Sequence, residues 1–313
     1  MAQVSIARLF EDNREKLKLE WVAGRSGSAK ALNSELIKDS SRGLIGHLNF
    51  IHPNLIQVLG ASEVAYLNGL DGAACRSQLA RTVTQELACF IVAGQDPAPQ
   101  ALVEIAETRA MPLFRSPVAS VELMWMLRPY LARALADSTT THGVFLDVLG
   151  MGVLITGDSG VGKSELGLEL ISRGSGLIAD DVVELYRIGP ETVEGRCPGL
   201  LKDFLEVRGL GVLDIRTIFG EAALRPRKNL KLIVHLEKPA AIEGVPLERL
   251  PLKPGSEPVM GVDIRKVTIP VAAGRNLAVL TEAAVRNYVL QLRGFDSTQE
   301  FVDRQSQQIK KRE

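Results

Sequence analysis

Apolar and polar residues follow strand-like and helix-like patterns in turn through the first half of the chain. Short apolar or alternating runs predict strands at 17–22, 55–59, 87–92 and 111–114, and longer periodic segments predict helices at 62–70, 99–108 and 118–136. Strands that alternate with helices are usually joined by crossovers, so we expect parallel pairing. The first half is therefore predicted to be one α/β domain, residues 1–134.

The second half begins with two strand-like segments, 142–149 and 152–156, separated by a short glycine-containing turn. A parallel crossover needs a dozen or more residues, so these strands should form an antiparallel hairpin. Further strands are expected at 177–179, 230–236 and 267–270, and helices at 165–173, at 281–292 and after Gly294. The polar segment 137–141 is interpreted as an interdomain linker. A second domain with a mixed sheet is predicted over residues 135–313.

A glycine-rich segment directly follows the second strand of this hairpin. Residues 157–164 read G-D-S-G-V-G-K-S and match the phosphate-binding loop pattern G-x-x-x-x-G-K-[ST] between a strand and a helix. Such a loop directs backbone N–H groups at a phosphate chain, with a lysine at the outer phosphates and a hydroxyl placed for Mg²⁺. The predicted nucleotide-binding residues are Gly157, Asp158, Ser159, Gly160, Val161, Gly162, Lys163 and Ser164. The chain is therefore expected to bind a nucleoside triphosphate or a related anion.

Composition excludes several other classes of protein. Lys plus Arg and Asp plus Glu number 37 each, and no long stretch is strongly basic, so nucleic acid is not an expected partner. No run approaches eighteen apolar residues, so no membrane span is expected, and the first residues do not resemble a signal peptide. The three cysteines lack metal-ligand spacing and are expected to be reduced thiols. We therefore expect a cytoplasmic protein.

Chemistry-bearing residues outside the loop lie in three further places. Asp180 and Asp181 end a predicted strand, where paired carboxylates suit Mg²⁺ binding or proton abstraction, although adjacent acids are more often a solvated turn. Segment 205–214 combines an acid, an arginine and two glycines; the simpler interpretation is an edge strand with a bulge. The irregular segment 239–258 suits a functional flap. His47 and His52 stand alone and are interpreted as structural.

Five motifs occur together in the second half: 141–144, 157–164, 179–184, 205–214 and 270–278. In this combination and order the chain resembles the HPr kinase/phosphorylase family, with segment 205–214 the most specific match. The first half resembles the accessory domain of that family on weaker grounds. The resemblance implies a second domain similar in fold to the phosphoenolpyruvate carboxykinase core around the phosphate loop, which agrees with the expected hairpin. It also implies a homo-oligomer, namely a hexamer.

The resemblance further implies an activity that regulates carbon metabolism. ATP would phosphorylate a serine of the phosphocarrier protein HPr, and inorganic phosphate would remove the phosphoryl group at the same Mg²⁺-dependent site and release pyrophosphate. The implied catalytic residues are His142, Lys163, Asp181 and Arg249, and the implied Mg²⁺ ligands are Ser164 and Glu206. Asp181 would accept the serine proton in one direction and return it in the other.

The sequence departs from the family pattern in one place and leaves two alternative functions open. Ala272 and Ala273 occupy positions where a basic residue followed by proline is expected, in a stretch, 270–275, that the resemblance links mainly to dephosphorylation. A kinase of a small metabolite would use the first domain as a substrate lid and would show no activity on HPr. A nucleotide-gated regulatory module would bind nucleotide with negligible transfer to any acceptor protein.

Overall fold

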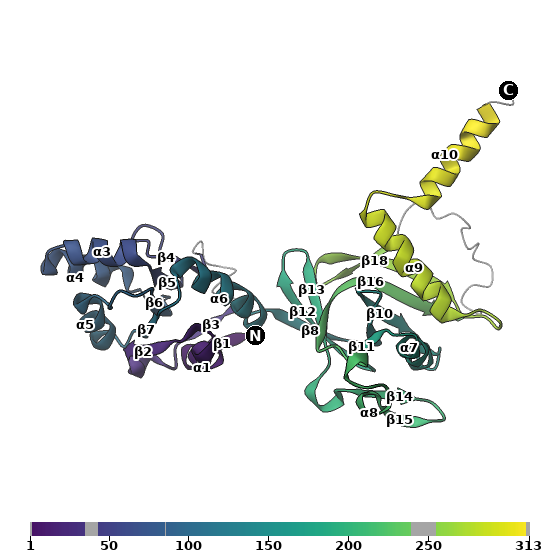
Figure 1. Ribbon diagram of the computed structural model, residues 1–313, viewed down its shortest axis with the longest axis horizontal. Helices are drawn as coiled ribbons and strands as arrows, with labels where there is room; N and C mark the ends of the chain where they lie inside the picture. The colour runs from purple at the N-terminus through teal and green to yellow at the C-terminus, as the bar shows by residue number, and fades with distance from the viewer. Residues whose placement is uncertain (1, 35–42, 85, 239–254, 311–313) are drawn as a thin grey trace. The chain divides into compact units, whose positions relative to one another are not determined.

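The computed structural model describes residues 2–34, 43–84, 86–238 and 255–310, and the chain divides between Asp137 and Ser138 into two compact units. Arg249, expected in the active site, lies outside the described residues, as do residues 239–254 around it. Figure 1 shows the helices and strands of both units. None of the helices in the described part of the chain is long and apolar enough to cross a bilayer.

The first unit is built on a five-stranded sheet in the order β2-β7-β6-β5-β4. The strands of the sheet are β2 (Glu20–Ala23), β4 (Ile45–His47), β5 (Ile56–Leu59), β6 (Cys89–Ala93) and β7 (Leu113–Ser116), and β1 (Gln3–Ser5) pairs separately with β3 (Ala31–Asn33). The helices are α1 (Ile6–Leu17), α3 (Ala61–Gly69), α4 (Gly72–Thr82), α5 (Gln100–Thr108) and α6 (Ser120–Ala134). The expected parallel pairing is confirmed for β5, β6 and β7, and β4, which was not expected, also pairs parallel to β5.

Two local expectations for this unit were wrong. Leu17 is the buried last residue of α1 rather than the start of a strand, and the strand begins at Glu20 and pairs antiparallel to β7. Helix α4 was not anticipated; Asp71 begins it by accepting hydrogen bonds from the N–H groups of Ala73 and Ala74. The Asp71–Gly72 pair, interpreted only as the end of one helix, is thus also the start of the next.

The second unit contains a nine-stranded mixed sheet with the order β11-β9-β10-β16-β13-β12-β8, and β18 pairs with β16 and with β17. Its strands are β8 (Asp137–His142), β9 (Val144–Val148), β10 (Met151–Gly157), β11 (Gly176–Ala179), β12 (Val182–Gly189), β13 (Thr192–Arg196), β16 (Arg227–Glu237), β17 (Gly255–Val259) and β18 (Val262–Pro270). β9 and β10 are antiparallel, so the predicted hairpin is confirmed.

The division between the two units falls at the start of the polar segment 137–141, but this segment is a strand rather than an irregular connection, because it forms most of the edge strand β8 beside β12. An edge strand that faces water needs no apolar side chains, and its three threonines are β-branched residues that favour strands. Similarly, residues 255–258 of the segment expected to be irregular belong to β17, which pairs antiparallel to β18. The polar residues of these two segments gave no strand pattern in the sequence. β8 and β17 form because each pairs with a neighbouring strand of the sheet.

Helix α7 (Lys163–Ser172) connects the sheet to the remaining elements of the second unit. Leu166 and Leu170 of α7 pack in one core with β9 and β10, and Leu205 of β14 (Phe204–Val207) joins the same core. α9 (Leu277–Leu292) contacts α7, and α10 (Ser297–Lys310) ends the described chain. In Figure 1, β14, β15 (Gly211–Asp214) and α8 (Ile215–Phe219) form a group at one end of this unit. This core fixes the phosphate loop between the sheet and β14.

Candidate active site

The phosphate loop leaves β10 at Gly157 and enters α7 at Gly162. Gly157 has a φ of 142°, and a Cβ there would lie 2.5 Å from the carbonyl oxygen of Leu236 on β16, so the loop approaches the neighbouring strand too closely for a side chain. The Lys163 ammonium turns back over the loop and donates hydrogen bonds to the carbonyl oxygens of Gly157 (2.9 Å) and Asp158 (3.0 Å). The positive charge of Lys163 and the N-terminus of α7 therefore face the same small volume.

Asp180 connects three elements beside this loop. Its carboxylate is 6% exposed and accepts hydrogen bonds from the Ser164 hydroxyl (3.1 Å) and from the backbone N–H of Glu206 (2.9 Å). Burial raises the pKa of Asp180, and the two hydrogen bonds offset this only in part. The carboxylate thus fixes the position of β14 relative to the first turn of α7.

The pH dependence of stability is expected to reflect this burial. The folded protein holds the Asp180 proton more tightly than the unfolded chain does, because its pKa is raised from 3.8. The contribution of Asp180 to the free energy of unfolding should therefore fall as pH rises from about 3.8 through the raised folded pKa. Urea unfolding of the wild type and of Asp180→Asn at several pH values measures this difference.

The control for that titration is Asp263→Asn, which removes an exposed carboxylate of the same sheet. The stability of the wild type relative to Asp180→Asn should be greatest at the acid end of the range. If the difference in free energy of unfolding between the wild type and Asp180→Asn stayed constant with pH, or grew as pH rose, burial would not be the main influence on the pKa of Asp180.

Asp181 differs from its neighbour in exposure and backbone conformation. It has a φ of 61°, and its side chain is 74% exposed. The Nδ1 atom of His142 lies 3.6 Å from the Asp181 carboxylate and 3.2 Å from its carbonyl oxygen, which also accepts a hydrogen bond from the N–H of Gly143 (3.1 Å). The junction between β8 and β9 therefore holds Asp181 in place while its carboxylate stays accessible to an incoming group.

Segment 205–214 forms a hairpin of β14 and β15 rather than a single bulged edge strand. Leu205 and Val207 point into the core, so Glu206 between them faces the other way and lines the cavity at the phosphate loop. Arg208 begins the turn of the hairpin, and a Cβ at Gly160 would lie 3.1 Å from its guanidinium. The Arg208 guanidinium therefore lies against the phosphate loop at Gly160 and lines the same cavity.

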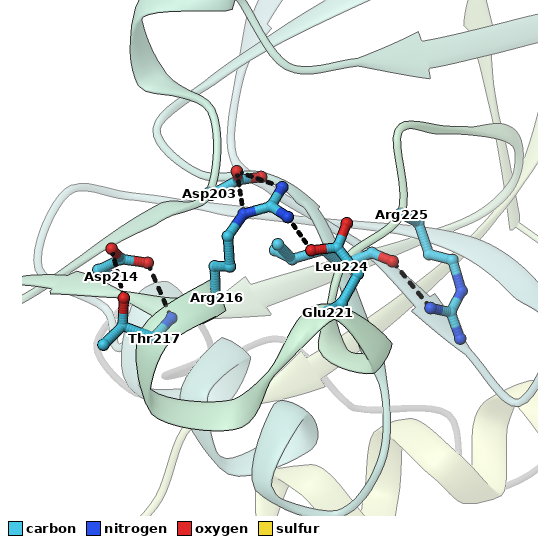
Figure 2. Close-up of polar contacts among 7 residues, drawn as sticks. All are labelled: Asp203, Asp214, Arg216, Thr217, Glu221, Leu224 and Arg225. Atoms are coloured by element: carbon cyan, nitrogen blue, oxygen red, sulfur yellow. Dashed lines mark hydrogen bonds and ion pairs between the residues drawn. The ribbon is translucent and has the colours of Figure 1, made fainter.

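A polar network at the base of the hairpin is drawn in Figure 2. The Arg216 guanidinium of α8 donates two hydrogen bonds to Asp203 (3.0 and 2.8 Å), which directly precedes β14, and pairs with Glu221. Asp214 caps α8 by accepting from the N–H (3.0 Å) and hydroxyl (2.8 Å) of Thr217. These contacts connect the two ends of the hairpin to α8, and thereby hold Glu206 and Arg208 beside the loop.

Arg216→Ala is expected to loosen this hairpin without unfolding the protein. The loss of the bonds to Asp203 should cost about 1 kcal/mol, because the pair is partly exposed. Amides of 204–214 should then exchange with deuterium about fivefold faster. Hydrogen-exchange mass spectrometry measures this, with Arg187→Ala, an exposed arginine at the β12–β13 turn, as the control. Equal exchange in both variants would mean that the network does not restrain the hairpin.

These elements enclose an open cavity of about 270 Å³ over the phosphate loop. Its lining comprises Ser159, Gly160, Gly162, Lys163, Ser164, Glu165, Asp180, Asp181, Glu206 and Arg208. The structure thus brings Lys163, Ser164, Asp181 and Glu206 together, and His142 joins them through Asp181. Asp180 was singled out only as one half of an acidic pair and Arg208 only as part of segment 205–214, and neither was assigned a role of its own. The sequence features that could have identified these two residues were the acidic pair at 180–181 and the arginine within segment 205–214.

The oxygen-rich lining suits Mg²⁺ only in combination with a phosphate ligand. Among the described residues, no group of three or more His, Cys, Asp or Glu side chains could hold a metal ion by itself. Protein Mg²⁺ sites commonly use one or two carboxylates, with phosphate oxygens and water as the other ligands. Glu206 and the Ser164 hydroxyl, which is fixed by Asp180, provide a set of this kind.

Comparison with known proteins connects this site to a family. Residues 133–305 match the family described as the HPr serine kinase C-terminal domain, and residues 4–131 match the HPr serine kinase N terminus. An HPr kinase/phosphorylase of Nitrosomonas europaea is 59% identical over 309 residues, covering 99% of this chain and 96% of the relative. One of Chromobacterium violaceum is 54% identical over 313 residues, covering 100% and 98%.

Among solved structures, an HPr(Ser) kinase/phosphatase of Coxiella burnetii is 38% identical and has a TM-score of 0.46. The match covers 52% of this chain and 98% of that one.

Proposed function

The chain belongs to the HPr kinase/phosphorylase family, and from this premise we propose that it transfers the γ-phosphoryl group of ATP to a serine of the phosphocarrier protein HPr. At the same site, inorganic phosphate would attack the phosphoserine and yield pyrophosphate and free HPr. The chain would thus be both a protein serine kinase and a phosphorylase that regulates carbon metabolism. The observation that carries this proposal is the cavity that joins a phosphate loop to Asp181 and Glu206.

The first requirement of phosphoryl transfer is to position the phosphate chain and balance its charge. The N–H groups at the start of α7 and the Lys163 ammonium face the volume in which the β- and γ-phosphates would lie. Arg208, whose guanidinium lies next to Gly160, supplies a second positive charge to the same cavity. We propose that these two side chains hold the γ-phosphoryl group between them, in agreement with the role of Lys163 implied by the motif.

The second requirement is a group that carries the proton of the serine hydroxyl. The Asp181 carboxylate is exposed in the cavity, and His142 and Gly143 restrain its backbone. In the forward direction the serine oxygen forms a bond to the γ-phosphorus, the bond to ADP breaks, and Asp181 accepts the serine proton. In the reverse direction phosphate oxygen attacks the phosphoserine, and protonated Asp181 returns the proton to the departing serine oxygen.

Ser164 and Glu206 would hold Mg²⁺ together with oxygens of the bound phosphates. When bound, Mg²⁺ would neutralise charge on those oxygens as it is redistributed during transfer. Asp180 contributes indirectly, because it accepts hydrogen bonds from the Ser164 hydroxyl and from the backbone of Glu206 and so fixes both ligands. The catalytic role of Arg249 is proposed from the family resemblance alone.

We further propose a cytoplasmic homo-oligomer, as the hexamer implied by the motifs. The hairpin and its surroundings expose large apolar side chains, among them Leu200 (96% exposed), Leu210 (67%) and Val212 (65%). An interface between copies of the chain would cover these side chains. Native mass spectrometry of the purified protein measures the oligomeric state.

A two-step assay tests the catalytic proposal. Purified protein, Mg²⁺-ATP and HPr are incubated, and mass spectrometry is expected to find one added phosphoryl group on a serine of HPr. Inorganic phosphate is then added, and pyrophosphate and unmodified HPr are expected to appear. Phosphorylation without pyrophosphate release would remove the phosphorylase half of the proposal and direct attention to Ala272 and Ala273. ATP binding with no transfer to HPr would contradict the proposal as a whole.

A further inference from the structure

The first unit contains a cavity of about 440 Å³ that the proposed function does not use. Residues within 10–28 form it, from one face of α1, the start of β2 and the turn that follows β2. Its volume lies within the roughly 300–1,000 Å³ range of small-molecule sites. Its lining has two parts, an apolar floor and a charged rim, which together indicate the kind of ligand that would fit.

The floor of the cavity is formed by Phe10, Leu19 and Trp21. Phe10 and Leu19 are 8% and 3% exposed, and the rings of Phe10 and Trp21 meet edge to face with 5.2 Å between their centroids. Both rings also pack against Phe114 of β7. The indole N–H of Trp21 already donates to the carbonyl oxygen of Ala23 (2.8 Å). The floor therefore offers a ligand an apolar, mainly aromatic surface.

Four charged side chains form the rim of the cavity, namely Glu11, Arg14, Glu20 and Arg25. The Arg14 guanidinium lies 5.8 Å from the centroid of the Phe10 ring, and the Arg25 guanidinium lies 5.7 Å from that of Trp21. A stacked guanidinium presents its face to the ring and keeps the N–H groups at its edge free. Within the described residues, none of these four side chains forms an ion pair or a hydrogen bond. Two guanidiniums and two carboxylates are thus available to a ligand.

The turn that closes the cavity is fixed in place before any ligand binds. The carbonyl oxygen of Ser28 accepts a hydrogen bond from the N–H of Ala7 in α1 (3.1 Å). A Cβ at Gly27 would lie 2.0 Å from the carbonyl oxygen of Ala110, so the turn packs closely against the residues that follow α5. A preformed cavity loses little conformational freedom when a ligand enters it.

A ligand that uses the whole lining must carry a positive group, a negative group and an apolar group. A carboxylate pairs well with a guanidinium, and an ammonium donates well to a carboxylate. A simple anion would leave the two glutamates without a partner, and a simple amine would leave the two arginines without one. Of the common small metabolites, an α-amino acid places both charges on one carbon and an apolar side chain beside them.

We propose that this cavity binds a free α-amino acid with an apolar or aromatic side chain. The carboxylate of the ligand pairs with Arg14 and Arg25, its ammonium pairs with Glu11 and Glu20, and its side chain lies on the aromatic floor. The first unit is then a binding module for a metabolite. This inference goes beyond the proposed kinase function and does not depend on it.

The fluorescence of Trp21 provides a direct test. The chain has two tryptophans, and the other one, Trp125, is 78% exposed on α6 and does not line the cavity. The full-length Trp125→Phe variant therefore reports on Trp21 alone. We expect L-phenylalanine and L-leucine each to change its emission in a saturable way. No saturation with either amino acid would overturn the proposal.

Two analogues of L-phenylalanine test whether both charges are recognised. 3-Phenylpropionate lacks the ammonium and 2-phenylethylamine lacks the carboxylate, and each would leave one pair of rim charges without a partner. We expect each to bind about tenfold more weakly than L-phenylalanine, or worse. Equal affinity for all three compounds would show that the cavity binds only an apolar group, which would contradict the assignment.

Arg25→Met removes one guanidinium and keeps an apolar stem of similar length beside Trp21. Calorimetric titration should show a rise of about tenfold in the Kd for L-phenylalanine. Arg109→Met is the matched control, because Arg109 is an exposed arginine of the same unit that does not line the cavity. An unchanged Kd in Arg25→Met, or an equal rise in the control, would reject the site.

The double variant Glu11→Gln/Glu20→Gln examines the other half of the rim. It should weaken the binding of L-phenylalanine and leave that of 3-phenylpropionate no weaker than before, because only the amino acid carries an ammonium. An equal loss for both compounds would contradict the proposed orientation. Phosphorylation of HPr is assayed separately: its failure would reject the proposed function and leave the binding results unaffected.

Discussion

Replacing Asp181 by asparagine is expected to lower the rates of HPr phosphorylation and of phosphorolysis together, by a factor of about 10²–10⁴. The carboxylate that accepts the serine proton in one direction must return it in the other, and an amide does neither. Asparagine matches aspartate in shape and tolerates the left-handed backbone at this position, so the fold should be retained. Single-turnover rates with ATP and with phosphate measure both directions.

Asp263→Asn is the matched control, because it removes an exposed carboxylate of the same unit that lies outside the cavity. Both of its rates should equal those of the wild type. If Asp181→Asn abolished the kinase and left phosphorolysis at the wild-type rate, the idea of one proton carrier for both directions would be wrong.

Lys163→Met should reduce kcat in both directions by about 10²–10³. The change keeps the length and apolar stem of the side chain and removes the ammonium that faces the phosphate-binding volume. Because the ammonium would bind phosphates that ATP and pyrophosphate share, the loss should be similar for the two donors. Steady-state kinetics with each donor, at saturating HPr, measures it.

The control for charge near the loop is Lys238→Met. Lys238 also lies beside the phosphate loop, where its ammonium is 3.4 Å from the Asp158 carboxylate, but it does not line the cavity. We expect little change in kcat for this variant. A similar loss in both variants would show that Lys163 contributes a general positive potential and makes no specific contact with the transferred group.

The sequence was most informative where neighbouring residues determine the structure. The β9–β10 hairpin followed from the short distance between two apolar segments, and the phosphate loop followed from glycines whose backbone angles and close contacts exclude side chains, as at Gly157. The parallel order of β5, β6 and β7 followed from the helices between them. In each case the determining residues lie within one strand–turn or strand–helix unit.

Features that depend on distant contacts could not be predicted in this way. Two adjacent aspartates read alike in the sequence, yet Asp180 is buried by hydrogen bonds that include the backbone of Glu206, 26 residues later, whereas Asp181 is exposed. The placement of Arg208 over Gly160 depends on a hairpin held by Asp203 and Arg216. The assignment of Asp181 and Glu206 came from motif resemblance, because spacing alone does not distinguish the two acids.

The left-handed backbone at Asp181 has a consequence for the evolution and engineering of this protein. A non-glycine residue in that region carries a conformational cost of about 1 kcal/mol, which glycine at the same position would avoid. Selection for thermal stability alone would therefore favour a chain that has lost the proposed proton carrier. A substitution at this residue could raise stability and lower activity at once, so a screen for more stable variants should measure turnover in every round.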